Sequence, residues 1–149
     1  MTQQEKVNVH KDFHGAMSYG IQHVYERYGE EAMTAFLQQV AREVYGPLTE
    51  RLRKEGLKAL EEHWRRIFTV EEGDFELSYE RERLVLKVHK CPAIHHMKPH
   101  GYAIADKYCE HTRLVNEGIC HAAGYECSVE YDQENGRCVQ QFWRKDTGM

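Results

Sequence analysis

The spacing of apolar residues changes near residue 70, and this change constrains the fold more than any other feature of the sequence. Before residue 70, apolar side chains recur every three or four residues, as one face of an α-helix requires. After it, apolar and polar side chains alternate, as they do in a half-buried β-strand. We therefore expect an α+β domain, in which N-terminal helices precede a β-β-α-β-β unit with an antiparallel sheet.

The N-terminal half predicts three or four helices that glycine and proline separate. Asp12 is placed to cap the first helix, and Tyr28-Gly29 is placed to end it. Gly46-Pro47 interrupts the second helical run, because proline suits the first turn of a new helix but cannot continue the preceding one. Gly56 is expected to bend or split the third run. The three apolar faces consist of Phe13, Met17, Ile21, Val24 and Tyr28; Met33, Phe36, Leu37, Val40 and Val44; and Leu48, Leu52, Leu57, Leu60, Trp64, Ile67 and Phe68.

Two predicted hairpins flank one helix in the C-terminal half. Cys91-Pro92 ends the second strand, because proline removes a ladder donor. A polar, histidine-rich loop is then expected as far as Gly101. Gly124 is a candidate C-cap for the helix that follows, and Asn135-Gly136 is a strong signal for the turn of the second hairpin. The expected strands cover residues 75–79, 84–88, 127–131 and 138–142, and the expected helix covers residues 103–123.

Length and composition indicate a single domain over residues 1–149, with a helical half at about 10–68 and a sheet-plus-helix half at about 74–144. No apolar run reaches the ~18 residues of a membrane span. Residues 1–6 also lack the apolar run of a secretory signal. The formal net charge of −4 argues against binding to nucleic acid through bulk charge. We therefore expect a cytoplasmic protein with a small-molecule partner, no nucleic acid and no membrane, and we allow for a homodimer.

Five cysteines and ten histidines are the most informative counts in the sequence. A domain of this size needs no disulfides to hold its core, and the number of cysteines is odd, so we expect reduced thiols. In that setting cysteine together with histidine indicates metal binding or catalysis more often than disulfide bonds. Five of the ten histidines fall between His89 and His111.

Cys91, Glu117, Cys120 and Cys127 are candidate ligands for zinc or another divalent metal. Glu117 and Cys120 are three residues apart, so they share one face of the predicted helix. Cys127 follows on the next strand, and Cys91 ends an earlier one. Three thiolates and a carboxylate can close a tetrahedral zinc site. The alternative is that Cys120 and Cys127 are buried apolar residues, as free cysteines commonly are.

Cys109, His111 and His14 are candidate catalytic residues. Cys109 and His111 could act as an activated thiolate and its base, or as two metal ligands, although residues two apart do not face each other on a continuous helix. His10 and His14 have the spacing that places two imidazoles on one helix face, but Lys11 stands where a metalloprotease motif has glutamate. The alternative is one core cysteine with a histidine at the surface.

The cations in and after the expected loop at residues 91–101 are candidates for holding an anionic substrate. A loop at the end of a strand can line a pocket, because the strand supplies a rigid base. The alternative is a surface loop in which the histidines have no common role. The candidate substrate-binding residues are His10, His95, His96, Lys98, His100, Arg113 and Asn116.

Several of these motifs resemble known families. Lys11-Asp12-Phe13-His14, Tyr28-Gly29-Glu30-Glu31, Tyr45-Gly46-Pro47-Leu48 and Cys91-Pro92 resemble the L-2-amino-thiazoline-4-carboxylic acid hydrolase family, over most of the chain. The segment Glu117-x-x-Cys120-x-Ala122-x-Gly124-x-x-Cys127 resembles the zinc-binding end of 4-vinyl reductase domains. It differs from that pattern in a shorter gap between Cys120 and Cys127, and in the additional Cys109 and Cys138.

The first resemblance implies a hydrolase that opens a small sulfur–nitrogen ring with water and gives a carbamoyl-cysteine. A bound metal would activate the water and polarise the C=N carbon while a histidine acts as general base, or Cys109 would attack without a metal. We therefore expect a small metal-assisted hydrolase that acts on a cyclic C–N/C=N bond of a small carboxylate. The second resemblance implies an alternative, a non-enzymatic small-molecule-binding domain with a structural zinc site. A scaffold domain with incidental cysteines is the third interpretation.

Overall fold

The computed structural model describes residues 10–145, which form an α+β fold in which helices come first and a four-stranded antiparallel sheet follows. This confirms the expected fold class. Residues 1–6, interpreted above as lacking a secretory signal, lie outside the described residues. The helices are α1 (Asp12–Tyr28), α2 (Glu30–Val44), α3 (Gly46–Glu55), α4 (Leu57–Val70), α5 (Pro92–Met97) and α6 (Glu110–His121). The strands are β1 (Asp74–Glu80), β2 (Arg83–Lys90), β3 (Tyr125–Asp132) and β4 (Arg137–Arg144).

Two glycines with left-handed backbone separate the N-terminal helices. Gly29 has φ 94° between α1 and α2, and Gly56 has φ 81° between α3 and α4. Glycine adopts this region without the steric cost that a Cβ atom would bring. Gly56 therefore splits the third helical run, as predicted. The prediction that Asp12 caps α1 is wrong, because Lys11 is the N-cap residue and no side chain caps the helix.

The sheet has the strand order β1-β2-β4-β3, so the two predicted hairpins pair through β2 and β4. Leu86 of β2 lies opposite Gln140 of β4, and Phe142 of β4 lies opposite Cys127 of β3. The side chains of Leu84, Leu86 and Phe142 are fully buried. The two central strands therefore carry much of the core, while β1 and β3 form the edges.

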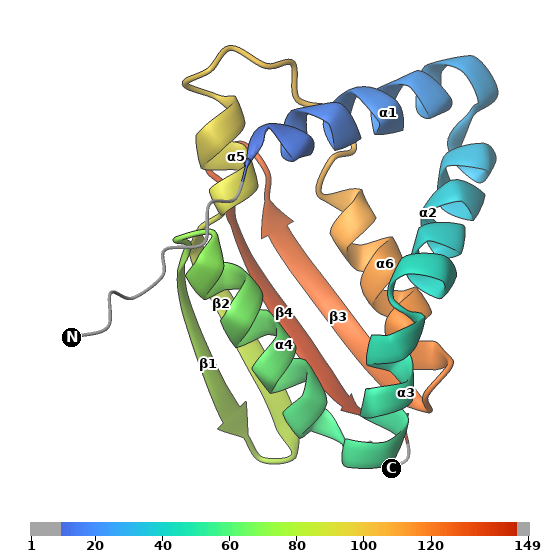
Figure 1. Ribbon diagram of the computed structural model, residues 1–149, viewed down its shortest axis with the longest axis vertical. Coiled ribbons are helices and arrows are strands. Elements are labelled where there is room, and N and C mark those ends of the chain that lie inside the picture. Colours follow the sequence, from blue (N-terminus) through green and yellow to red (C-terminus); the bar gives the residue numbers. More distant parts are fainter. Residues whose placement is uncertain (1–9, 146–149) are drawn as a thin grey trace.

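The helices build the rest of the core around this sheet. Figure 1 shows α4 over β1 and β2, α6 beside β3, and α1 across the end of the sheet at the β3–β4 turn. Helices α2 and α6 pack very closely, because a Cβ atom at Gly118 would lie 2.5 Å from the Cβ of Ala41. Buried residues of these helices include Ile21, Met33, Leu37, Leu52, Leu60 and Ile119.

The segment between β2 and α6 differs from the prediction. A short helix, α5, occupies the first part of the expected loop, and turns follow as far as Gly101. Pro92 lies in the first turn of α5, where proline is well tolerated. The expected helix over residues 103–123 begins only at Glu110. The preceding backbone hydrogen-bonds to α1 instead: the hydroxyl of Ser18 donates to the carbonyl of Ala103 at 2.9 Å and accepts from the amide of Ala105 at 2.7 Å. These bonds tie the segment to α1 in a non-helical course.

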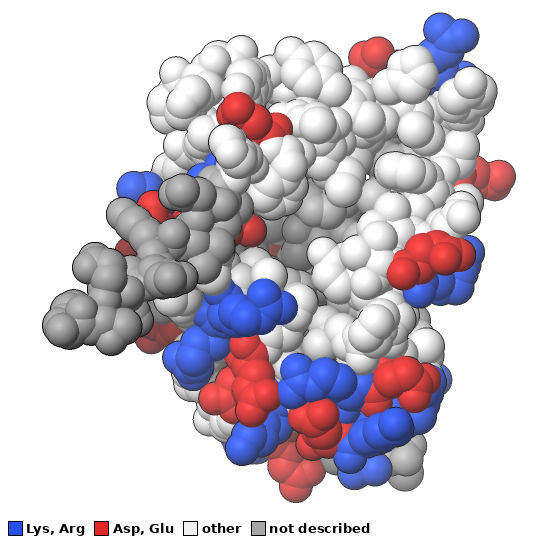
Figure 2. Space-filling model, in the orientation of Figure 1, with Lys and Arg blue, Asp and Glu red and all other residues white. Residues whose placement is uncertain are grey.

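The surface in Figure 2 carries mixed charge. Lysine and arginine side chains gather at its lower part and are interspersed with aspartate and glutamate, whereas the upper part is largely uncharged. Ion pairs within and between α3 and α4 include Arg51 with Glu55 at 2.9 Å and Arg51 with Glu62 at 2.7 Å. None of the helices described between residues 10 and 145 combines the length and the apolar character needed to cross a membrane.

Candidate functional site

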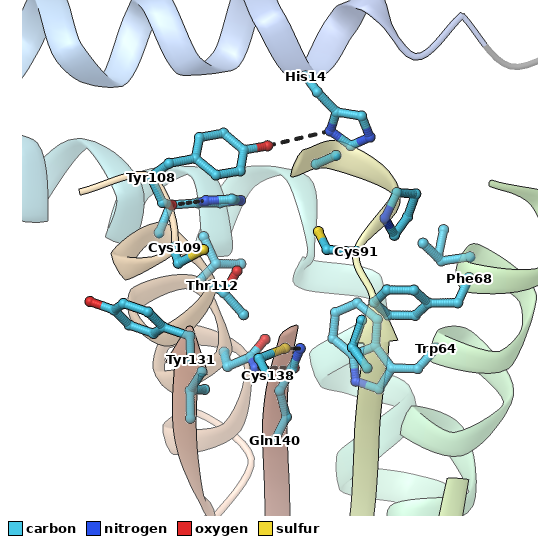
Figure 3. Close-up of a pocket in the computed structure, with 18 of the residues that line it drawn as sticks. His14, Trp64, Phe68, Cys91, Tyr108, Cys109, Thr112, Tyr131, Cys138 and Gln140 are labelled. Carbon is cyan, nitrogen blue, oxygen red and sulfur yellow. Dashed lines mark hydrogen bonds between the residues drawn. The ribbon is translucent and has the colours of Figure 1, made fainter. Parts of the chain in front are cut away.

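A cavity of about 300 Å³ lies between the helices and the sheet. Its walls come from α1, α2, α4, α5 and α6 and from β2, β3 and β4, together with the segments that precede α3, α5 and α6. Most of the lining is apolar. Figure 3 shows His14 at one end, Trp64 and Gln140 toward the other, and three thiols between the walls. The few polar groups on these walls decide what the cavity can bind or do.

At one end of the cavity, His14 is held between a carboxylate and a phenol. Its Nε2 lies 2.7 Å from Oε1 of Glu71, and the hydroxyl of Tyr108 lies 3.4 Å from its Nδ1. Only 13% of the His14 side chain and 11% of the Glu71 side chain are exposed. Because a carboxylate only accepts hydrogen bonds, Nε2 donates to Glu71, and in the neutral form of the ring Nδ1 carries the lone pair. The α1 helix thus presents a basic nitrogen to the cavity.

Tyr108 and His111 complete this end of the cavity. Burial raises the pKa of Tyr108 above its ordinary value and lowers the pKa of His111 below its ordinary value. The Nδ1 of His111 donates to the backbone carbonyl of Tyr108 at 2.5 Å, so the Nε2 of the neutral ring is left without this proton. Both side chains are therefore uncharged at neutral pH, and the charged residues among those that line the cavity are Glu71 and Arg137.

Three thiols line the cavity from three elements. Cys91 lies between β2 and α5, Cys109 precedes α6, and Cys138 lies on β4. Figure 3 shows all three beside the same space. Burial raises the pKa of Cys109 to about 12 and that of Cys138 to about 11, and it also raises the pKa of Cys91. The thiols are therefore protonated at neutral pH.

A buried amide pair connects two walls of the cavity. Nδ2 of Asn116 on α6 donates to Oε1 of Gln140 on β4 at 2.8 Å, and Nε2 of Gln140 in turn lies 3.4 Å from Sγ of Cys138. Asn116 is 1% exposed and Gln140 is 3% exposed. Buried amides that satisfy each other in this way fix the position of the helix against the sheet.

The wall formed by α4 is aromatic. Trp64 lies near His63, Phe68 and Phe142, with ring centroids 4.6, 6.3 and 6.4 Å away respectively. Burial lowers the pKa of His63 to about 4, and the charges of Arg66 and Arg51 lower it further. His63 is therefore neutral at neutral pH.

The four candidate metal ligands do not form a group that could hold a metal ion in the described part of the chain. The pKa of the Cys120 thiol is raised by its hydrogen bond with Cys127 and by burial. Nearby negative charges, including that of Glu117, raise it further. Cys91 lies on the cavity, where neither Cys120 nor Cys127 is a lining residue. Glu117 accepts a hydrogen bond from Arg113 at 2.7 Å. Among residues 10–145, no group of three or more His, Cys, Asp or Glu side chains could hold a metal ion. The donor set does not fit the predicted site.

The candidate catalytic residues, by contrast, all lie around the same cavity. His14, Cys109 and His111 all line the cavity, although Cys109 and His111 are only two residues apart in sequence. The helix begins at Glu110, so the objection that neighbours on a continuous helix face different ways does not apply to Cys109. Of the candidate substrate-binding residues, Asn116 also lines the cavity.

The other candidate substrate-binding residues lie outside the cavity lining and have partners of their own, apart from His10, which is exposed before α1. The partners are backbone carbonyls or carboxylates. The side chains that were expected to bind an anionic substrate therefore contact oxygen atoms of the protein itself. His95 contacts the Asn135 carbonyl, His96 contacts Asp12, Lys98 contacts the Glu134 carbonyl, His100 contacts the His96 carbonyl, and Arg113 contacts Glu110 and Glu117.

The polar residues of the cavity that sequence reasoning missed include His63, Glu71, Tyr108 and Cys138. Glu71 follows the last residue of α4, and no local pattern connects it with His14, which is 57 residues away. Tyr108 was expected on a helix face, and Cys138 was considered only as an additional cysteine. Alternation along β4 was the one available signal, since it placed Cys138 and Gln140 on one face of the strand.

A scan against protein-family models finds no match for this chain, and a search of curated proteins finds no relative. The resemblances described above therefore stay predictions. The functional argument rests on the cavity and on the groups that line it.

Proposed function

We propose that this protein is a small-molecule hydrolase, in which the cavity is the active site and His14 is the general base. The observation that carries the proposal is the environment of His14: Glu71 holds one ring nitrogen, and the other faces Tyr108 at the cavity wall. Imidazole is suited to proton transfer near neutral pH, and a carboxylate behind it fixes the tautomer and supports the imidazolium. The cavity supplies a mostly apolar space of about 300 Å³ for a small ring.

The proposed reaction is the opening of a cyclic C=N compound by water. Water adds through its oxygen to the carbon of the C=N bond, and its proton passes to Nδ1 of His14. Glu71 stabilises the imidazolium that forms. The π electron pair of the C=N bond moves to the ring nitrogen. As the added oxygen forms a C=O bond, its remaining proton passes to that nitrogen. The bond between the same carbon and the ring sulfur breaks, and the sulfur leaves with the bond's electron pair and takes a proton back from His14. For an amino-thiazoline carboxylate, the product would be a carbamoyl-cysteine.

This mechanism uses neither a metal nor a thiolate. The predicted metal ligands do not fit a site, so no step is assigned to a metal. Cys109 has a pKa of about 12, and a thiol that holds its proton so tightly is a poor nucleophile at neutral pH. In this proposal Cys91, Cys109 and Cys138 are polarisable wall residues that contact the substrate.

A second candidate is a non-enzymatic domain that binds a small apolar molecule. The mostly apolar lining and the three protonated thiols favour this alternative. Both candidates predict binding in the cavity. They differ in whether water is added to the bound molecule.

The test is turnover of L-2-amino-thiazoline-4-carboxylate, followed by mass spectrometry of carbamoyl-cysteine. We expect His14→Gln to lower kcat/KM by roughly 10²–10⁴-fold, which is the usual contribution of a general base. His96→Gln is the matched control, because His96 also contacts a carboxylate, that of Asp12. Its kcat/KM should stay within about twofold of the original.

Full activity of a folded His14→Gln protein would exclude the proposed base. Saturable binding of the compound without any product would favour the binding domain instead. Melting curves for both variants identify any loss of activity that comes from unfolding.

A further inference from the structure

Two buried polar atoms, both in residues that line the cavity, have no hydrogen-bond partner. They are Nε2 of His63 and Nε1 of Trp64, and they are the buried side-chain nitrogen or oxygen atoms without a partner in the part of the chain that the structure describes. Both residues lie on α4, and both line the cavity. A buried donor without a partner costs roughly 1–3 kcal/mol, so such atoms are normally satisfied. Two such atoms in adjacent residues that line one cavity suggest that a ligand atom satisfies them.

The chemistry of these atoms selects the ligand atom. The indole N–H of Trp64 only donates, so its partner must accept. His63 is neutral and can donate from Nε2 in one of its tautomers. The positive charges of Arg66 and Arg51 reach His63, since they contribute to keeping it unprotonated. Two donors in a positive potential suit an oxygen atom with partial or full negative charge.

We propose that His63 and Trp64 form a binding subsite for an acceptor oxygen of the ligand, carried by a carboxylate or a carbonyl group next to a planar ring. The ring would pack against the aromatic wall of Trp64 and Phe68, which Figure 3 shows away from His14. This subsite takes over the role that the sequence assigned to Lys98, His100 and Arg113. The inference rests on the proposed function, which makes this cavity the active site. It adds the residues that would orient the substrate there.

The test measures the hydrogen bond directly. In ¹⁵N-labelled Trp143→Phe protein, Trp64 is the one remaining tryptophan, so its indole N–H gives a single resonance. The probes are benzoate, benzamide and toluene, which share a ring and differ in the acceptor. We expect benzoate or benzamide to move the indole proton downfield in a saturable way, while toluene binds without a downfield shift. Tighter binding of benzoate than of benzamide would identify a carboxylate site, and the reverse would identify a carbonyl site.

A second variant separates the subsite from the shape of the cavity. His63→Phe keeps a ring and removes the donor, so we expect the affinity for the better acceptor probe to fall roughly tenfold, as the loss of one such bond predicts. The affinity for toluene should change by less than about twofold. A missing downfield shift with both acceptor probes overturns the inference, as does unchanged affinity in His63→Phe.

These readouts are independent of turnover. Probe binding at Trp64 in a protein that releases no carbamoyl-cysteine would leave the subsite standing and remove the hydrolase. Turnover that depends on His14, without any response of Trp64, would leave the hydrolase and remove the subsite.

Discussion

The histidines of the cavity and the histidines of the α5 segment show how differently the same side chain is used in two regions of this molecule. His14, His63 and His111 line the cavity. Burial lowers the pKa of His63 and His111, and the buried carboxylate of Glu71 contacts His14. The α5 segment has the denser histidine sequence, yet its side chains contact backbone carbonyls and a surface carboxylate. Local density of histidine therefore did not identify the site.

The contrast is sharpest within the first turn of α1. Asp12 pairs with His96 at 2.9 Å, and His14 pairs with Glu71 at 2.7 Å. The two pairs have the same chemistry, but 64% of the Asp12 side chain is exposed against 11% of the Glu71 side chain. Water screens an exposed pair, whereas a buried charge that loses its partner is costly. The two pairs should therefore respond very differently to the same substitution.

The largest effect is expected for His14→Ala, which leaves the Glu71 carboxylate buried without its partner. We expect the free energy of unfolding to fall by about 3 kcal/mol, which is typical when a buried charge is left without its partner. Denaturation with urea, followed by circular dichroism, measures it.

His96→Ala is the matched control for that substitution. It removes the same ring from an exposed carboxylate and should barely move the urea midpoint. Equal losses in the two variants would mean that burial does not distinguish the two pairs.

A smaller effect is expected for the alkylation of Cys109. Here the comparison is between the buried thiol of the folded protein and the solvated thiol of the unfolded chain. Because its pKa is about 12, little thiolate is present at neutral pH, and only the thiolate reacts. We expect iodoacetamide to alkylate Cys109 at least about tenfold more slowly in the folded protein than in urea. Mass spectrometry of the modified peptide gives both rates. Comparable or faster labelling of the folded chain would restore Cys109 as a candidate nucleophile.

The smallest effect is expected for the pH dependence of stability. The pKa of His63 is lowered from 6.5 to about 4 in the folded state, so the unfolded chain binds more protons between these values. Its contribution is complete above the unfolded pKa and is lost as the pH falls through that window. Burial lowers the pKa of His111 in the same direction.

We therefore expect the Tm to fall between pH 7 and pH 5, and to fall less in His63→Phe. Trp64→Phe keeps His63 and should retain the original slope. Calorimetry at a series of pH values measures the difference. Parallel curves for His63→Phe and the unchanged protein would show that His63 titrates alike in both states.

Much of the fold could be predicted because its signals are local. The change of apolar period, the glycine at position 56 and the Asn135-Gly136 turn each act within a few residues, and the structure bears them out. The segment before α6 could not be predicted, because Ser18 fixes it from another part of the chain. The site was predicted in part, since His14, Cys109 and His111 do meet in the cavity. Glu71 and His63 depend on tertiary contacts that no spacing encodes.

The cavity draws its walls from Phe13 at one extreme and Gln140 at the other, with contributions from both the helical half and the sheet. No shorter stretch of the described chain contains all of the walls, so occupancy must be linked to the cooperative folding of the whole domain. A molecule that binds only the folded chain adds about 2.7 kcal/mol to its stability at one hundred times its dissociation constant. Thermal-shift measurements on the intact domain can therefore rank unknown compounds before any reaction has been observed.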